Sequence, residues 1–488
     1  MVPVTESLGP RVWLNAALLA GVTTLLGVLA GVHPSYAIGM AAVLVVTLLA
    51  FFAPVTHLSL LIALTTMVPY SIEGRYHLGG AGSGSGGLQA SDLFLLTGLL
   101  RAAVVLPQVK LTRRQLTVVA LVVTVCVFTA FEAWQGLRAG RAVTEVGAEF
   151  RGLGGGFACA LITMSVLTDR GSHRRMHRAL VVLGLALGLE GVLQWALGAG
   201  FSADFGVRAG VSLTTNGVGQ LQGGLFAFPI AVILSVAALA SGELRGWRQR
   251  GVVIAVLGLN AISLLLTFER TFWVATAVAV VLVGLRSGRA QRLRVLLSIA
   301  LCVVVGLSVL AAVSPTTLQT AEQRLLSIGQ YQTDNSVRYR TVESGFVLAK
   351  IRAKPLLGWG LGDTIFWGQP WEQVPPSAQS YTHVGYLWLF WREGLLGGGI
   401  VLLLLALSAV WPGRARAGRL VTAIKTGCQA CILALFVVDF TFPAFHQGSQ
   451  ITYVMGFLVA YCAVPVVSRS RSKAVSRRGE GLAYAARR

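Results

Sequence analysis

The chain contains long runs of apolar residues that recur along almost its whole length. An α-helix needs about 20 mostly apolar residues to cross the hydrocarbon core of a bilayer. Runs close to this length lie near 12–32, 36–53, 58–70, 90–106, 115–134, 152–167, 179–199, 218–240, 251–267, 271–285, 295–313, 383–411, 420–440 and 451–467. They predict fourteen membrane spans, or as few as twelve, because the run at 58–70 is short enough to be a half-helix.

The composition agrees with a chain embedded in lipid. Of the 488 residues, 55% are hydrophobic and 12% are charged, with a mean hydropathy of +0.72, whereas soluble domains carry about 25% charged residues. We therefore predict an all-α fold, a polytopic membrane helical bundle of about 12–14 transmembrane helices that forms one integral membrane domain over residues 1–467. The run at 12–32 has neither an extended basic segment before it nor an A-x-A-like site after it, so we expect a first span rather than a signal peptide.

Basic residues predict the orientation of the spans. The formal net charge is +21, but most of the 40 Lys and Arg lie in short connections between apolar runs, which indicates topology rather than nucleic-acid binding. Their clusters fall on one side of the membrane, at 110–114, 170–178, 245–250, 286–294, 414–419 and 469–488. By the positive-inside rule this side is the cytoplasm, so both termini are predicted to be cytoplasmic. The basic tail at 468–488 is predicted to be disordered beside anionic membrane lipids.

The opposite side carries one sizeable extramembrane segment, at 314–382. Mixed charges follow a helical spacing over 322–350, and prolines and glycines interrupt the chain from Pro355 to Pro376. We predict a large extracytoplasmic loop inserted in the membrane domain, with one or two short helices and an irregular cap.

Few residues on this outer side suit a metal or a redox group. The loop at 314–382 contains no D-x-D-like pair of acids. All six cysteines fall inside apolar runs, and the C-x-x-C spacing of Cys428 and Cys431 has no second pair to complete a metal site, so packing is the favoured role. We expect no cofactor and no metal, and metal independence is a hypothesis.

Some arginines lie on the outer side, where the positive-inside rule disfavours them, and four stand out: Arg208, Arg270, Arg338 and Arg340. Arg75, Arg138, Arg141 and Arg151 lie there too, but in loops where nothing else suggests chemistry, so we predict that they are solvated. Arg270 stands between two apolar runs with almost no loop, so its guanidinium is predicted at the membrane boundary. A cation there can hold a phosphate or a carboxylate. The alternative is a pair with Glu269, or snorkelling to the lipid headgroups.

Arg338, Arg340 and His383 belong to the large loop and its end. The planar guanidinium group suits bidentate phosphate binding, but Arg340 could instead pair with Glu343 on a solvated helix face. His383 opens the apolar run that follows the loop, with aromatic residues after it. A histidine there can act as a general base, bind phosphate, or simply lie at the membrane interface.

The order of these segments resembles the O-antigen ligase and O-antigen polymerase family of membrane glycosyltransferases, over most of the chain. The similar segments are Arg208 followed by the turn 214–217 with Asn216, the helix start 267–270 with Arg270, Arg340 followed by the turn PLLGWG at 355–360, and His383 followed by EGLLG at 393–397. Three residues depart from the family pattern. Glu269 stands where Ser is usual, Val384 where Asn usually follows the histidine, and Thr215 where Pro is usual.

This resemblance implies transfer of a glycan from an undecaprenyl-diphosphate carrier to an acceptor hydroxyl, in surface polysaccharide biosynthesis at the outer face of the bacterial cytoplasmic (inner) membrane. The acceptor would be lipid A core for a ligase, or the growing glycan for a polymerase. Arginines can neutralise the leaving diphosphate without a metal. The site residues implied are His383, Arg270 and Arg340 for catalysis, and Arg208, Arg338, Asn216 and Glu393 for substrate binding.

The rival hypothesis is a lipid-linked oligosaccharide flippase or another polytopic transporter. A transporter is expected to bury ionisable residues in its spans. The residues of this kind are Asp92, Arg101, Glu190, Arg392, Glu393 and Asp439. Because they are few, and because transport needs no large loop before His383, the pattern favours the transferase.

Overall fold

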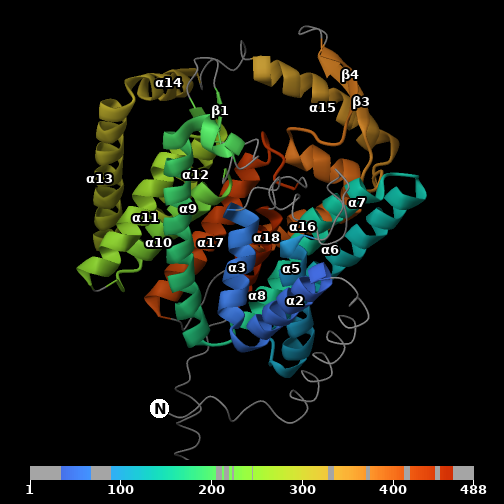
Figure 1. Ribbon diagram of the computed structural model, residues 1–488, viewed down its shortest axis with the longest axis horizontal. Coiled ribbons are helices and arrows are strands. Elements are labelled where there is room, and N and C mark those ends of the chain that lie inside the picture. Colours follow the sequence, from blue (N-terminus) through green and yellow to red (C-terminus); the bar gives the residue numbers. More distant parts are fainter. Residues whose placement is uncertain are drawn as a thin grey trace, which may run out of the picture.

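The structure is a computed structural model that describes residues 34–67, 89–204, 211–213, 219–221, 225–244, 246–327, 335–369, 374–411, 418–445 and 451–464. The predicted span at 12–32, the tail at 468–488, and the candidates Arg208 and Asn216 lie outside the described residues. The described part confirms the all-α membrane bundle (Figure 1).

Each of the other thirteen predicted spans contains a helix. These helices are α2 (Pro34–Phe52), α3 (Pro54–Met67), α5 (Ala90–Val105), α6 (Arg113–Arg138), α8 (Gly156–Val166), α9 (Arg170–Asp204), α10 (Ala227–Ala240), α11 (Trp247–Leu265), α12 (Arg270–Leu285), α13 (Arg289–Val313), α16 (Gly385–Val410), α17 (Arg419–Val438) and α18 (Ile451–Ala463). Among the described residues, seven helices are long and apolar enough to cross a membrane, and the shorter apolar ones include α10, α12 and α18. A short helix α7 (Val143–Phe150) leads through a π-helical turn into α8.

Helix α10 lies at the centre of one part of the bundle and α13 at its edge. Every residue of α10 except Ala231 is buried, against α9, α11, α12 and α17. In contrast, most of the apolar side chains of α13 are exposed, as expected for a helix that faces lipid. Figure 1 shows α13 standing apart at the side of the bundle.

Helix α10 begins at Ala227, later than the predicted span at 218–240. Gly219–Leu221 forms β2 instead, which pairs antiparallel with β1 (Val211–Leu213). The glycines of this stretch disfavour a helix, because glycine loses the most backbone freedom on folding. The amide of Leu221 donates to the carbonyl of Leu266 at 3.0 Å and so ties the hairpin to the turn between α11 and α12.

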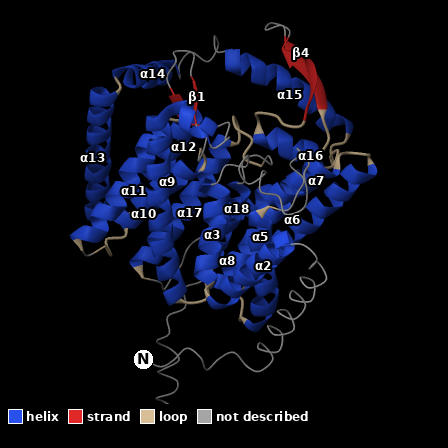
Figure 2. Ribbon diagram, viewed as in Figure 1, coloured by secondary structure: helices blue, strands red, loops and turns tan. Residues whose placement is uncertain are grey.

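The described residues of the large loop form two helices, where the sequence predicts one or two short ones, and a hairpin that it does not predict. The helices are α14 (Pro315–Leu326) and α15 (Asn335–Ala353), and β3 (Ile365–Gln369) pairs antiparallel with β4 (Val374–Gln379). Two prolines in β4 obscure the strand in the sequence, but a two-stranded sheet tolerates them because its edges need no partner. Figure 2 shows all strands gathered at one end of the bundle, beside α14 and α15. We call this the loop end.

Helix α16 is broken, although its sequence predicts one continuous span. Gly394 has φ 60° and ψ −173°, far from helical values. The chain continues as a helix on both sides, so this single residue separates a short segment that begins at Gly385 from the long apolar segment that ends at Val410.

Candidate functional site

His383 lies at the loop end, two residues before α16 begins, and a carboxylate from the large loop holds it. Its Nδ1 lies 3.1 Å from Oε2 and 3.2 Å from Oε1 of Glu343, and its backbone N–H donates to Oε2 at 2.9 Å. The Thr382 hydroxyl donates to the same oxygen at 3.0 Å. The Glu343 side chain is fully buried, whereas that of His383 is 28% exposed. The imidazole is therefore oriented from within and open to solvent on one side.

Glu343 reaches this position because α15 turns one face towards the bundle. Glu343 and Val347, one helical turn apart, are both fully buried. Arg340 precedes them on the same side and is half-buried, with its Nε enclosed, while Arg338 is exposed. The described residues contain no ion pair between Arg340 and Glu343, so the structure does not show the pairing that their spacing suggested, and Glu343 pairs with His383 instead.

Two tyrosines enclose the His383 ring. The Tyr339 ring centroid lies 5.1 Å and that of Tyr381 5.4 Å from the imidazole centroid, both edge to face. Burial and the nearby Glu343 carboxylate raise the pKa of Tyr381, and a hydrogen bond with Tyr339 opposes this only in part. Tyr381 is therefore a neutral phenol at physiological pH, able to donate or accept a hydrogen bond beside His383.

Arg270 is the first residue of α12, after a tight turn from α11. Phe268 in this turn has φ 52°, a left-handed conformation that is uncommon for a bulky residue and that is found at functional sites. Its buried ring packs against Ala321 of α14. The Arg270 Nη1 donates to the carbonyl of Ser327 at 3.1 Å and to its hydroxyl at 2.9 Å. The guanidinium thus lies at the end of α14, with its donors aimed at oxygen atoms.

A chain of contacts links the surroundings of His383 with those of Arg270. Gly385, at the start of α16, donates its N–H to the carbonyl of Asp439 at 2.8 Å. Two residues further, the hydroxyls of Thr441 and Thr271 are hydrogen-bonded at 2.8 Å. Thr271 is the neighbour of Arg270 in α12. The segment after α17 therefore joins the starts of α12 and α16 at the loop end.

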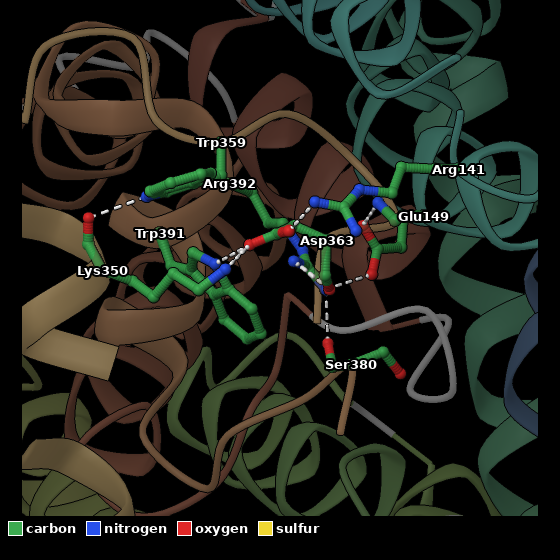
Figure 3. A network of polar contacts seen from close by, with 9 residues as sticks. Arg141, Glu149, Lys350, Trp359, Asp363, Ser380, Trp391 and Arg392 are labelled. Atoms are coloured by element: carbon green, nitrogen blue, oxygen red, sulfur yellow. Dashed lines mark hydrogen bonds and ion pairs between the residues drawn. The ribbon is translucent and has the colours of Figure 1, made fainter. Parts of the chain in front are cut away.

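Arg392 lies at the centre of a buried polar network (Figure 3). Its guanidinium donates to Glu149 Oε1 at 2.7 Å, to the Asp363 carbonyl at 2.6 Å and to the Ser380 carbonyl at 2.5 Å. The Arg392 and Glu149 side chains are both fully buried. We call this the Arg392 network, and it comprises Arg141, Glu149, Lys350, Asp363, Ser380, Trp391 and Arg392. Since Ser380 precedes His383 by three residues, the network fixes the segment that carries the histidine.

Asp363 gathers the cations of the same network. Its carboxylate pairs with Arg141, and it accepts hydrogen bonds from Lys350 Nζ at 2.8 Å and Trp391 Nε1 at 2.9 Å. Burial alone would raise the pKa of Asp363, but the hydrogen bonds from Lys350 and Trp391 and the charges of Lys350 and Arg141 together hold it below its usual range. Asp363 is thus ionised and joins α15 and α16 to the segment that precedes α7.

The turn at 355–360 closes the break in α16. The amides of Trp359 and Gly360 donate to the carbonyls of Trp391 and Arg392 at 3.0 and 3.2 Å. In return, the amides of Leu395 and Leu396 donate to the carbonyls of Pro355 and Leu356 at 2.8 and 3.2 Å. The turn therefore pairs these backbone groups of α16, which the break would otherwise leave without a partner.

Glycine is required on both sides of this contact. A Cβ on Gly358, whose φ is +73°, would lie 2.3 Å from the Arg392 carbonyl oxygen, and one on Gly394 would lie 2.2 Å from that of Leu356. Glu393, in the same break, is buried next to Gly397. The two glycine-rich segments recognised separately in the sequence are therefore the two halves of one structural joint.

Several residues of the site carried no local signal in the sequence. Glu343 lies 40 positions before His383, and Glu149 lies 243 positions before Arg392, so nothing in either neighbourhood identifies its partner. Within the described ranges, no group of three or more His, Cys, Asp or Glu side chains is arranged to hold a metal ion.

Comparison with known proteins finds a family that matches the central part of the chain. A search of curated protein sequences finds no match. A family model described as "O-Antigen ligase" matches residues 253–402, from α11 into α16. This range holds Arg270, Arg338, Arg340, His383 and Glu393, and it confirms the family resemblance and favours glycan transfer over transport. Over residues 253–402 the chain is therefore similar to the O-antigen ligase family.

Proposed function

We propose that this O-antigen ligase-type transferase takes its glycan from an undecaprenyl-diphosphate carrier and joins it to an acceptor hydroxyl at the outer face of the bacterial cytoplasmic membrane. The observation that carries the proposal is the chain of contacts from His383 through Gly385, Asp439, Thr441 and Thr271 to Arg270. It unites a candidate base and a boundary cation at the loop end, where a lipid diphosphate would enter from the membrane surface.

The two arginines neutralise the diphosphate. Arg270 already donates to two neutral oxygens of Ser327, and phosphate oxygens would form stronger, charge-assisted hydrogen bonds with it. Arg340 adds a second permanent charge from the inward side of α15. Charge develops on the leaving oxygen as the glycosidic bond breaks, so fixed cations there lower the barrier without a metal.

His383 serves as the general base. The acceptor oxygen attacks the anomeric carbon, and its proton passes to the imidazole. The bond between that carbon and the diphosphate oxygen breaks, and its electron pair leaves with undecaprenyl diphosphate. We favour this role over a cation that holds diphosphate, because Arg270 and Arg340 already supply permanent positive charge.

Transfer by the purified protein in liposomes tests the proposal. The probe is a fluorescent oligosaccharide linked to undecaprenyl diphosphate, offered with lipid A core. His383→Ala should lower the rate by about 10²- to 10⁴-fold. If His383 acts as a base, its replacement should leave the affinity for the carrier unchanged. If it acts as a cation that binds the diphosphate, its replacement should weaken that affinity. Arg270→Ala should also abolish transfer, and Arg270→Lys should not restore it fully, because a point charge lacks the planar fork.

The matched control is Arg352→Ala, an exposed arginine on the same helix as Arg340, which should retain the wild-type rate. Full transfer by an Arg270→Ala protein that still inserts would refute the role of the boundary arginine. Product length separates the acceptors, because a ligase attaches glycan to lipid A core, whereas a polymerase lengthens the lipid-linked glycan when no core is present.

A further inference from the structure

Glu343 is a buried carboxylate whose hydrogen bonds all converge on the segment that carries His383. Its Oε2 accepts from the Thr382 hydroxyl at 3.0 Å and from the His383 backbone N–H at 2.9 Å. Both of its oxygens lie within 3.2 Å of the His383 Nδ1. A fully buried carboxylate costs free energy unless it is paired and hydrogen-bonded. These donors account for its burial, and the chain places its negative charge against one particular ring nitrogen.

We propose that Glu343 is the positioning residue of the transferase, which holds the proton of His383 on Nδ1 and leaves Nε2 as the atom that accepts the proton of the acceptor hydroxyl. This inference rests on the proposed function. An ionised carboxylate can only accept hydrogen bonds, so Nδ1 must be the donor in this pair. In neutral imidazole the other nitrogen then carries the lone pair.

The far side of the ring agrees with this assignment. Nε2 makes no hydrogen bond to any residue in the described part of the chain, and the His383 side chain is 28% exposed. Tyr339 and Tyr381 contact the imidazole edge to face and limit its rotation. The ring is thus fixed at Nδ1 and accessible at Nε2. When Nε2 takes the proton, the imidazolium that forms lies against the Glu343 carboxylate, which stabilises its charge.

Glu343→Gln separates positioning from packing. The Oε2 position must still accept two donors, so the amide oxygen should occupy it and the amide nitrogen should take the Oε1 position, 3.2 Å from Nδ1. The amide would then offer Nδ1 a donor at 3.2 Å beside the acceptor at 3.1 Å, so the tautomer with the proton on Nε2, which cannot accept another, would become populated. The variant would also lack the negative charge that stabilises the imidazolium. We expect a loss in kcat of at least about 10-fold, within the ~10²- to 10⁴-fold range of a general base, with little change in KM for the lipid-linked oligosaccharide.

The double variant tests whether the two residues act as a unit. In a His383→Ala background, Glu343→Gln should cause no further loss of kcat, since residues that act together are not additive. Glu322→Gln is the matched control, because it makes the same change at an exposed carboxylate on α14 of the same loop, and it should keep the wild-type rate. A wild-type kcat for Glu343→Gln, or an equal further loss in the His383→Ala background, would overturn the proposal.

A direct readout needs neither activity nor a variant at Glu343. Solid-state nuclear magnetic resonance of ¹⁵N-histidine protein, with His383 assigned by difference from His383→Ala, reports which ring nitrogen is protonated. For the neutral ring we expect the proton on Nδ1. A proton on Nε2 would refute the role of Glu343 even in an active transferase. Conversely, full transfer by His383→Ala would refute the histidine base of the proposed function, whatever the tautomer.

Discussion

Replacement of Arg392 should destabilise the protein more than replacement of any exposed arginine. Arg392→Gln leaves the Glu149 carboxylate fully buried without its cation and removes donors from the carbonyls of Asp363 and Ser380. Removal of one partner from a buried ion pair costs about 3–5 kcal/mol. Arg392→Lys keeps the charge but cannot reach all three acceptors. We therefore expect a smaller loss of about 1–3 kcal/mol, from two lost hydrogen bonds at about 0.5–1.5 kcal/mol each.

Equilibrium unfolding of the purified protein in mixed detergent micelles, followed by tryptophan fluorescence, measures these differences. Arg352→Gln is the control, because Arg352 is exposed in the last turn of α15, and it should change the free energy of unfolding by less than about 0.5 kcal/mol. Transfer should also slow in Arg392→Gln, since Arg392 holds the Ser380 carbonyl close in sequence to His383.

The double variant Arg392→Gln/Glu149→Gln isolates the cause. Neutral replacement of both members of a buried pair is often harmless, because no unpaired charge remains. The double variant should therefore be more stable than Arg392→Gln alone. If it is instead as unstable as the sum of the two single variants, an uncompensated buried charge is not the reason for the loss.

Three further predictions concern the loop, acid stability and topology. Gly358→Ala should destabilise the contact with α16 by at least about 1–2 kcal/mol, the cost of a left-handed conformation for a residue other than glycine. Gly345→Ala should not, because a Cβ there meets open space, and thermal unfolding of the two variants measures the difference. Because the pKa of Asp363 is lowered in the folded protein, the stability that its ionised carboxylate contributes is complete above pH ~3.9, the usual pKa. This contribution is lost as the pH falls through the pKa of the folded state, so acid unfolding should depend less on pH in Asp363→Asn. Reporter fusions at Ser287 should report cytoplasm and at Ser327 the outside, and a cytoplasmic signal at Ser327 would place the site on the wrong face.

The helical bundle could be predicted from the sequence because few backbone conformations are stable in lipid. Backbone groups in hydrocarbon must be paired within the segment, so an apolar run of sufficient length predicts a helix. Each of the thirteen predicted spans within the described residues contains one. Arg270 and His383 could also be singled out, because an arginine with almost no loop around it and a histidine at the start of a span are both exceptional in such a pattern.

Pairs of residues distant in the chain could not be predicted in this way. The sequence offered a pair between Glu343 and Arg340, three positions away, as the alternative to phosphate binding by Arg340, since helical spacing makes neighbours of such residues. The structure pairs Glu343 with His383 instead, 40 positions later, because α15 buries that face against the start of α16. Likewise, Arg392 was seen only as an ionisable residue in a span, and its partner Glu149 comes from a different helix.

Local sequence determined which segments become helices and which residues are chemically unusual, and tertiary structure decided which of them meet. The break of α16 at Gly394 shows the difference. Glycine is tolerated in membrane helices, so EGLLGGGI predicts an unbroken span. The helix opens there because the turn at 355–360 supplies the donors and acceptors that the break exposes. That exchange depends on packing between segments, which local periodicity cannot encode.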